Sequence, residues 1–119
     1  MINDVINFTD KFKMFNDKWA PKIIAQMNDY HIKLARFEGS FTWHDHKETD
    51  EVFIVIEGSV RIDFEESSTT LNEGELFIVS KGIRHKPYAE KECKILLIEP
   101  AGTKNTGESG GEQTSPNDI

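Results

Sequence analysis

The chain has 119 residues, of which 37% are hydrophobic and 29% are charged, and this length fits a single domain. The formal net charge is −7, which opposes binding to nucleic acid or to anionic membranes, because both are polyanions. We expect no membrane anchor and no export signal, since no stretch approaches the roughly 20 apolar residues that span a bilayer. Cys93 is the single cysteine and cannot form an internal disulfide, so we expect a cytoplasmic protein.

Residues 1–21 predict an N-terminal arm with one short helix. Spacings of four, three and four residues, which match one face of a helix, separate the aromatic residues Phe8, Phe12, Phe15 and Trp19. The helix is expected to end before Pro21. Aromatic residues at helical spacing are usually buried, so we expect this face to pack on the core.

Residues 22–100 predict short strands separated by turn residues. The expected strands are 22–27, 30–37, 41–46, 51–56, 59–64, 69–71, 76–79, 86–89 and 94–99. Turn signals between them include Asn28-Asp29, Gly39, Glu57-Gly58 and Glu90-Lys91-Glu92. Because no helix of 10–15 residues separates the strands, a parallel βαβ plan is excluded. We predict an all-β fold, either an antiparallel barrel or a double-sheet jelly roll.

Residues 101–119 differ in composition from the rest of the chain. They hold four of the eight glycines and no aromatic residue. Such a stretch buries too little apolar surface to offset the entropy lost on ordering. We therefore expect a disordered tail, beginning at about Asn105.

Three of the four histidines form the most informative pattern. His44 and His46 are two residues apart, which places both imidazoles on one face of a strand. Glu51 begins the next apolar run, and His85 follows a tight turn at residues 81–84. Three neutral imidazoles and one carboxylate suit Zn, Fe, Mn, Ni or Cu and leave positions open for water or substrate.

Two segments that contain these residues resemble the two conserved motifs of the cupin family. The first is GSFTWHDHKETDEVFIVIEG, residues 39–58, in which a Gly precedes His-x-His and a Glu follows. The second is GELFIVSKGIRH, residues 74–85, which ends on the third His. The resemblance implies a jelly-roll barrel over residues 22–100 that is often dimeric. It also implies one interior divalent metal ion, such as Zn, Fe, Mn or Ni, with the ligands His44, His46, Glu51 and His85.

Other segments are similar to a group of small cupins described as mannose-6-phosphate isomerase-like. They are residues 19–30, the triplet Thr49-Asp50-Glu51 and the ending 93–102. This label is a fold analogy and does not establish a reaction. The motifs also lack the surrounding basic cluster that a phosphosugar would call for.

Three classes of function remain open. The first is a metal-dependent enzyme, isomerase-like, epimerase-like or dioxygenase-like, acting on a small molecule such as a sugar or an organic acid. Its candidate catalytic groups flank the third His and are Arg84, Lys86 and Tyr88. The second is a sensor or storage protein that binds a small molecule or metal without turnover. The third is a dimeric scaffold, and in each case we expect a homodimer formed through the N-terminal arm and an outer sheet face.

Overall fold

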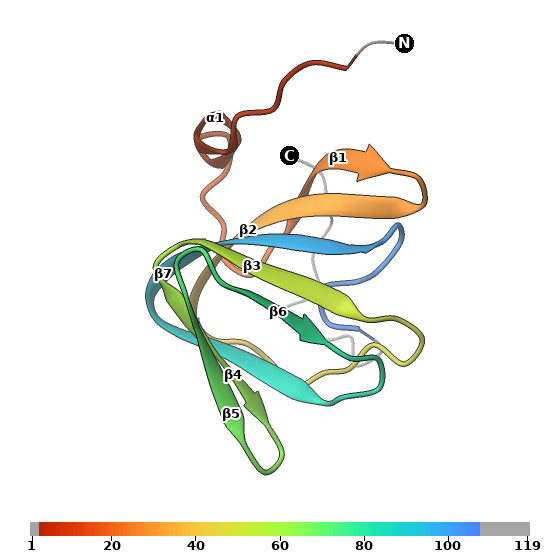
Figure 1. The fold of residues 1–119 in the computed structure, drawn as a ribbon. Coiled ribbons are helices and arrows are strands. Elements are labelled where there is room, and N and C mark those ends of the chain that lie inside the picture. Colours follow the sequence, from red (N-terminus) through yellow and green to blue (C-terminus); the bar gives the residue numbers. More distant parts are fainter. Residues whose placement is uncertain (1–2, 108–119) are drawn as a thin grey trace.

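The computed structural model describes residues 3–107, while residues 1–2 and 108–119 lie outside the described part (Figure 1). The described residues contain one short helix and seven strands, joined by turns and irregular segments. Their bounds are α1 Phe8–Phe12, β1 Lys22–Met27, β2 Tyr30–Ser40, β3 Glu51–Glu57, β4 Ser59–Phe64, β5 Ser68–Asn72, β6 Leu76–Val79 and β7 His85–Pro100.

The long strand β7 organises the sheet. It pairs antiparallel with β2 along most of its length, with β4 through its first residues and with β3 through its last residues. The strand order is β1-β2-β7-β3-β6, and β5 joins through β4 (Figure 1). Every pairing of named strands is antiparallel, which confirms the prediction of an all-β jelly-roll barrel.

Two of the strand predictions were wrong. The predicted turn at Glu90-Lys91-Glu92 is part of β7, and a register shift between Phe37 and Gly39 on β2 absorbs the irregularity opposite it. The predicted strand 41–46 is irregular, and its one bridge joins His44 to His85. Charged residues misled the prediction at the first place, and regular pairing of β2 with β7 ends at Ser40, just before the second.

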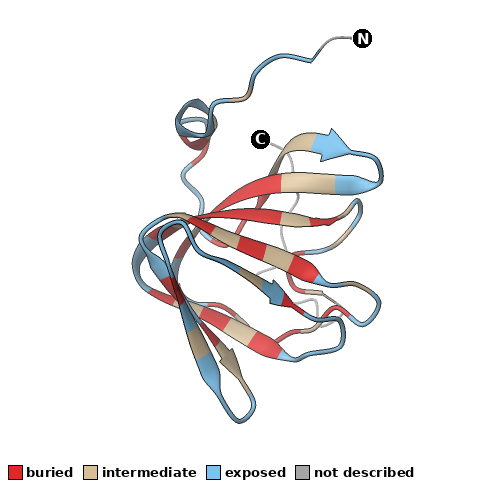
Figure 2. Ribbon diagram, in the orientation of Figure 1, coloured by how far each residue is buried: buried red, intermediate tan, exposed pale blue. Residues whose placement is uncertain are grey.

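Alternation along β2, β3 and β7 creates two apolar clusters, one on each face of the sheet. The bands of burial in Figure 2 follow this alternation along β3. The cluster inside the barrel includes Ala35, Phe37, Phe53, Val55, Ile95 and Leu97. The cluster on the outer face includes Leu34 and Leu96, with Ile32, Ile54 and Ile98 partly buried beside them.

The N-terminal arm contributes to both clusters. Helix α1 has five residues, and the aromatic residues beyond it do not continue one helix face. Phe12 and Phe15 pack in the outer cluster, whereas Trp19 enters the barrel and stacks on Phe37 and Phe41, with ring centroids 4.3 and 4.9 Å apart. Trp19 has φ of 58°, so the chain turns there and divides the aromatic set between the two faces.

The C-terminal segment, residues 101–107, follows β7 and packs against the barrel. Asn105 and Thr106 are buried, and the Asn105 amide donates a hydrogen bond of 2.9 Å to the carbonyl of Trp19. The predicted tail is thus packed at its beginning, and its remainder, 108–119, lies outside the described residues. Within residues 3–107, no helix is both long enough and apolar enough to cross a membrane.

Candidate metal centre

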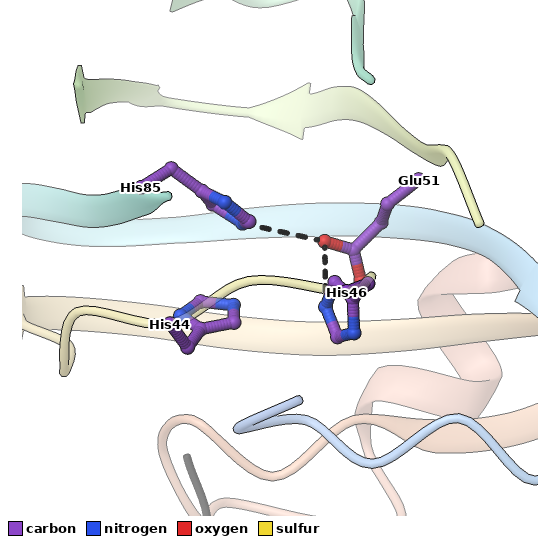
Figure 3. Close-up of side chains that lie close together, drawn as sticks. All are labelled: His44, His46, Glu51 and His85. Carbon is purple, nitrogen blue, oxygen red and sulfur yellow. Dashed lines mark ion pairs between the residues drawn. The ribbon is translucent and has the colours of Figure 1, made fainter. Parts of the chain in front are cut away.

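Four buried side chains lie close together (Figure 3). They are His44, His46, Glu51 and His85, and each offers one ligand atom within 4.8 Å of all the others. Glu51 begins β3 and His85 begins β7, while the other two histidines lie on the irregular connection from β2 to β3. The structure therefore brings together all four residues that the motifs singled out.

Backbone hydrogen bonds hold the irregular connection against β7. The N–H of His44 donates to the carbonyl of His85 at 3.0 Å, and the N–H of His85 donates to the carbonyl of His44 at 2.9 Å. The N–H of Gly82 donates to the carbonyl of His46 at 2.8 Å. His44 and His46 are thus held close to His85, although the connection that carries them is not a regular strand.

Carbonyl groups two residues upstream orient two of the three imidazoles. Nδ1 of His44 lies 3.0 Å from the carbonyl oxygen of Thr42, and Nδ1 of His85 lies 2.8 Å from that of Ile83. A carbonyl can only accept, so each Nδ1 carries the proton and each Nε2 keeps a free lone pair. This second contact is typical of metal-binding histidines.

Three buried polar atoms at the centre of the cluster have no hydrogen-bond partner. They are Nε2 of His46, Nε2 of His85 and Oε1 of Glu51. The carboxylate oxygen lies 3.5 Å from the first nitrogen and 3.7 Å from the second, which is too long for a good hydrogen bond. Unpartnered buried polar atoms are rare because they are costly. Three of them facing one point fit a bound cation.

The protonation states of the cluster also suit a cation. Burial, followed by the nearby His85, lowers the pKa of His44 from 6.5 to about 4, so its imidazole is neutral at pH 7. Burial opposes ionisation of Glu51, but its interactions with Glu99, His46 and His85 outweigh burial and hold the Glu51 pKa well below its usual range. The site therefore offers neutral nitrogen and anionic oxygen, a donor set suited to divalent transition metals.

A buried ion pair beside this cluster was missed by the sequence analysis. Nζ of Lys33 lies 2.7 Å from Oε1 of Glu99, and both side chains are almost fully buried. Burial and the neighbouring Glu51 carboxylate hold the pKa of Glu99 well above its usual range. Strand alternation could have predicted that both side chains point into the barrel. Lys33 shares a strand face with Ala35, and Glu99 shares one with Leu97.

The candidate catalytic groups Arg84, Lys86 and Tyr88 lie apart from the cluster. Along the start of β7, His85 is buried, whereas Arg84 is exposed and the other two are half-buried. The side chains of Arg84 and Lys86 lie over the ring of Trp43, and the ring of Tyr88 lies under Arg61. The structure thus places these three groups with partners outside the metal cluster.

A small interior cavity adjoins the cluster. It has a volume of about 20 Å³, which is room for about one water molecule. Its lining is largely aromatic and apolar, and among the described residues that line it none is Lys or Arg. The full lining is Trp19, Pro21, Phe37, Phe41, His44, Glu51, Phe53, Pro87, Leu97 and Asn105. Asn105 belongs to the C-terminal segment, so this segment helps to close the cavity.

A larger cleft lies outside the closed cavity. It has a volume of about 400 Å³ between the β2–β3 connection at Lys47–Thr49 and the C-terminal segment, and it reaches His46. Gly107 packs so closely there that an added Cβ would lie 1.9 Å from the carbonyl oxygen of Asp45. The C-terminal segment therefore forms one wall of the cleft, and His46 links the cleft to the metal cluster.

Two similar proteins carry names that state no activity. The chain is 38% identical over 84 residues to the uncharacterized protein YdbB of Bacillus subtilis (strain 168), covering 70% of this chain and 74% of the relative. A crystal structure of a cupin-2 domain containing protein from Shewanella frigidimarina is 55% identical, with a TM-score of 0.80. That similarity covers 81% of this chain and 94% of the Shewanella chain.

A more distant solved structure shares the fold alone. It is the hydroquinone 1,2-dioxygenase PnpCD in complex with Cd²⁺ and 4-hydroxybenzonitrile, which is 16% identical with a TM-score of 0.66. The similarity covers 77% of this chain and 70% of the dioxygenase chain.

The family model described as the cupin domain matches residues 31–99, which is more than half of the chain. The chain therefore belongs to the cupin family.

Proposed function

We propose that this cupin binds one divalent transition metal ion through His44, His46, Glu51 and His85 and uses it on a small molecule. The observation that carries the proposal is the convergence of unpartnered buried atoms on one point. A metal ion held there would act as a Lewis acid or, if it is redox-active, as a centre for oxygen chemistry. The protein's own part is to hold four donors in a dry, largely apolar chamber.

The cavity supports dioxygenase-like chemistry better than sugar isomerisation. Isomerisation needs an acid or base beside the metal, and Arg84, Lys86 and Tyr88 have their partners elsewhere. The lining carries aromatic rings and, among described residues, no cationic group for a phosphate. A small apolar or aromatic substrate fits this chemistry, and PnpCD, a cupin-fold neighbour, is a dioxygenase with an aromatic ligand.

A second candidate function is metal binding without turnover, as in a sensor or storage protein. A cavity of about 20 Å³ favours it, because no organic substrate fits in this interior cavity unless a covering element moves. The two candidates share the same metal site and differ in whether the site opens. Movement of the C-terminal segment is the step that separates them.

The first test is metal analysis of protein purified without a tag under anaerobic conditions. We expect about one transition metal ion per chain, with iron favouring oxygen chemistry and zinc favouring Lewis-acid chemistry. Protein that contains no metal and takes up none from Zn²⁺, Mn²⁺, Fe²⁺ or Ni²⁺ would refute the site. Oxygen consumption by the iron-loaded protein with hydroquinones then separates turnover from storage.

A homodimer and a cytoplasmic location complete the proposal. The outer sheet face carries exposed Leu76 and Ile78 on the edge strand β6, near the partly buried Ile54 and Ile98. A second copy covering this apolar face would also cover the edge strand. Sedimentation should show a dimer that Ile78→Lys weakens, and a wild-type monomer at all concentrations would contradict it. The single buried Cys93 accords with a reducing compartment.

A further inference from the structure

The pair Lys33–Glu99 is buried in the barrel interior, where apolar side chains are the usual content. Lys33 has none of its side chain exposed and Glu99 has 1%. Removing two charges from water is costly, and replacing such a pair by apolar residues is often neutral or stabilising. Its presence therefore points to a function beyond packing.

The sheet register places this pair beside a metal ligand. Val52 on β3 lies opposite Ile98 on β7, and continuing that antiparallel register by one residue places Glu51 opposite Glu99. Both side chains are buried, so the two carboxyl groups are cross-strand neighbours inside the barrel. Lys33 on β2 lies opposite Leu97, so its long side chain reaches Glu99 diagonally across the sheet. Three neighbouring strands thus supply a buried chain from Lys33 through Glu99 to Glu51.

A second contact fixes the lysine end of this chain. Nζ of Lys33 also donates to the carbonyl oxygen of Thr103, at 3.1 Å, in the C-terminal segment. The ammonium group is therefore held by acceptors on two elements, and its charge is fixed in position. At the other end, Oε1 of Glu51 faces Nε2 of His46 and Nε2 of His85.

We propose that Lys33 and Glu99 are positioning residues that hold the Glu51 carboxylate in the orientation in which it binds metal. This inference rests on the proposed metal function and adds two residues outside the cupin motifs. Glu99 braces the carboxylate of Glu51 through one contact, and Lys33 braces Glu99. Contacts that orient a metal ligand commonly contribute about 10–100-fold to metal affinity.

The test compares metal affinity in the full chain carrying Glu99→Leu, Glu99→Gln or the double change Lys33→Met/Glu99→Leu. Affinity for Zn²⁺ is measured by competition with a chromophoric chelator, and the ligand field is read from the visible spectrum of the Co²⁺-loaded protein. We expect Glu99→Leu to weaken binding by about 10–100-fold and to change the spectrum. Glu99→Gln should restore both, because an amide can accept from Lys33 and donate to Glu51.

The double variant separates positioning from stability. Without the buried charges it should melt near the wild-type temperature, yet it should bind Zn²⁺ about as weakly as Glu99→Leu. A folded double variant with wild-type affinity and spectrum would overturn the proposal. So would a Gln variant that binds as weakly as the Leu variant. Wild-type protein that binds neither metal would overturn both the metal function and this inference, so the two failures are distinguishable.

Lys22→Met is the matched control. Lys22 is also a buried lysine, and its Nζ lies 2.9 Å from Oδ2 of Asp17, away from the metal cluster. Removing this pair perturbs a buried lysine without touching the chain to Glu51. Its Zn²⁺ affinity and Co²⁺ spectrum should therefore match those of the wild-type protein.

Discussion

Lys33 and Arg36 lie three residues apart on β2, and the alternation of the strand sends their side chains to opposite faces. Lys33 is enclosed within the barrel and contacts Glu99 beside the metal cluster. Arg36 lies on the outer face, where it donates to the carbonyl groups of Phe12 and Phe15 and pairs with Glu92. The inner contacts converge on a ligand, whereas the outer contacts fasten the N-terminal arm.

This difference shows how one strand serves two purposes. A cation inside the barrel, such as Lys33, has few acceptors and needs a specific carboxylate as partner. Its contacts therefore bear on metal binding. A cation on the outer face can share carbonyl groups, aromatic rings and a half-exposed carboxylate, and its neighbours determine stability. Substitutions on the two faces should therefore separate metal binding from folding.

The largest expected effect is on the inner face, where His85→Ala should remove nearly all bound metal. The loss of one of four ligands also leaves Glu51 facing a single imidazole, so metal content should fall from about one ion per chain towards zero. Cys93→Ala is the control. The Cys93 thiol is buried within the barrel core and does not belong to the four-residue cluster. Burial raises its pKa to about 12. If metal analysis finds equal content in His85→Ala and wild type, the site assignment fails.

On the outer face, Phe12→Ala should reduce stability strongly and leave metal binding unchanged. Phe12 is 2% exposed and packs with Phe15 and the Arg36 guanidinium, so truncation should cost about 3 kcal/mol. Phe8→Ala on the same helix is the control, because Phe8 is 38% exposed and should cost well under half as much. Urea unfolding and metal analysis of both variants check the result. A parallel loss of metal would show that the two faces are not separable.

A smaller effect is expected where the C-terminal segment closes the inner face. Gly107→Ala places a Cβ 1.9 Å from the carbonyl oxygen of Asp45, which should weaken docking of the segment by about 1–3 kcal/mol. Because 1.4 kcal/mol is a factor of ten, metal should leave about tenfold faster when a chelator is added.

The matched control for this change is Gly102→Ala. Gly102 also has positive φ, at 88°, but a Cβ there meets nothing within 4 Å. Both substitutions strain the backbone, but Gly107→Ala alone places a methyl group against the carbonyl of Asp45. Equal rates of metal release from the two variants would show that the segment does not cover the site.

The metal cluster could be predicted from the sequence because its signal is local. His44, His46 and Glu51 lie within eight consecutive residues, and His85 ends a second compact motif. The all-β plan was equally visible, since alternation and turn residues recur throughout residues 22–100. Local patterns of this kind do not depend on which strands become neighbours.

What the sequence analysis missed depends on long-range pairing. Lys33 and Glu99 are 66 residues apart, and a charged residue in a strand ordinarily faces solvent. Charged Glu90-Lys91-Glu92 resembled a turn because its polarity was visible, whereas its pairing as part of β7 was not. Likewise, the spacing of Phe12, Phe15 and Trp19 suggested one face, and the turn at Trp19 sends them to two clusters.

The smallest expected effect is a pH dependence confined to the outer face. Hydrogen bonding to Arg36, together with Lys18, lowers the pKa of Glu92 below 4.5 in the folded protein. A depressed carboxyl pKa stabilises the fold above the unfolded value of about 4.5, and this contribution disappears as pH falls through the folded value.

Glu92→Gln should therefore cost less than about 1 kcal/mol at pH 6, because the pair is partly exposed, and almost nothing near pH 3. Urea unfolding of metal-free protein measures this difference, with Glu66→Gln, an exposed carboxylate in the β4–β5 turn, as control. A cost for Glu92→Gln that persists undiminished near pH 3 would show that its charge is not the cause. Zn²⁺ affinity should be unchanged at pH 7, because Arg36 on β2 and Glu92 on β7 pair outside the barrel, whereas the metal ligands are buried inside it.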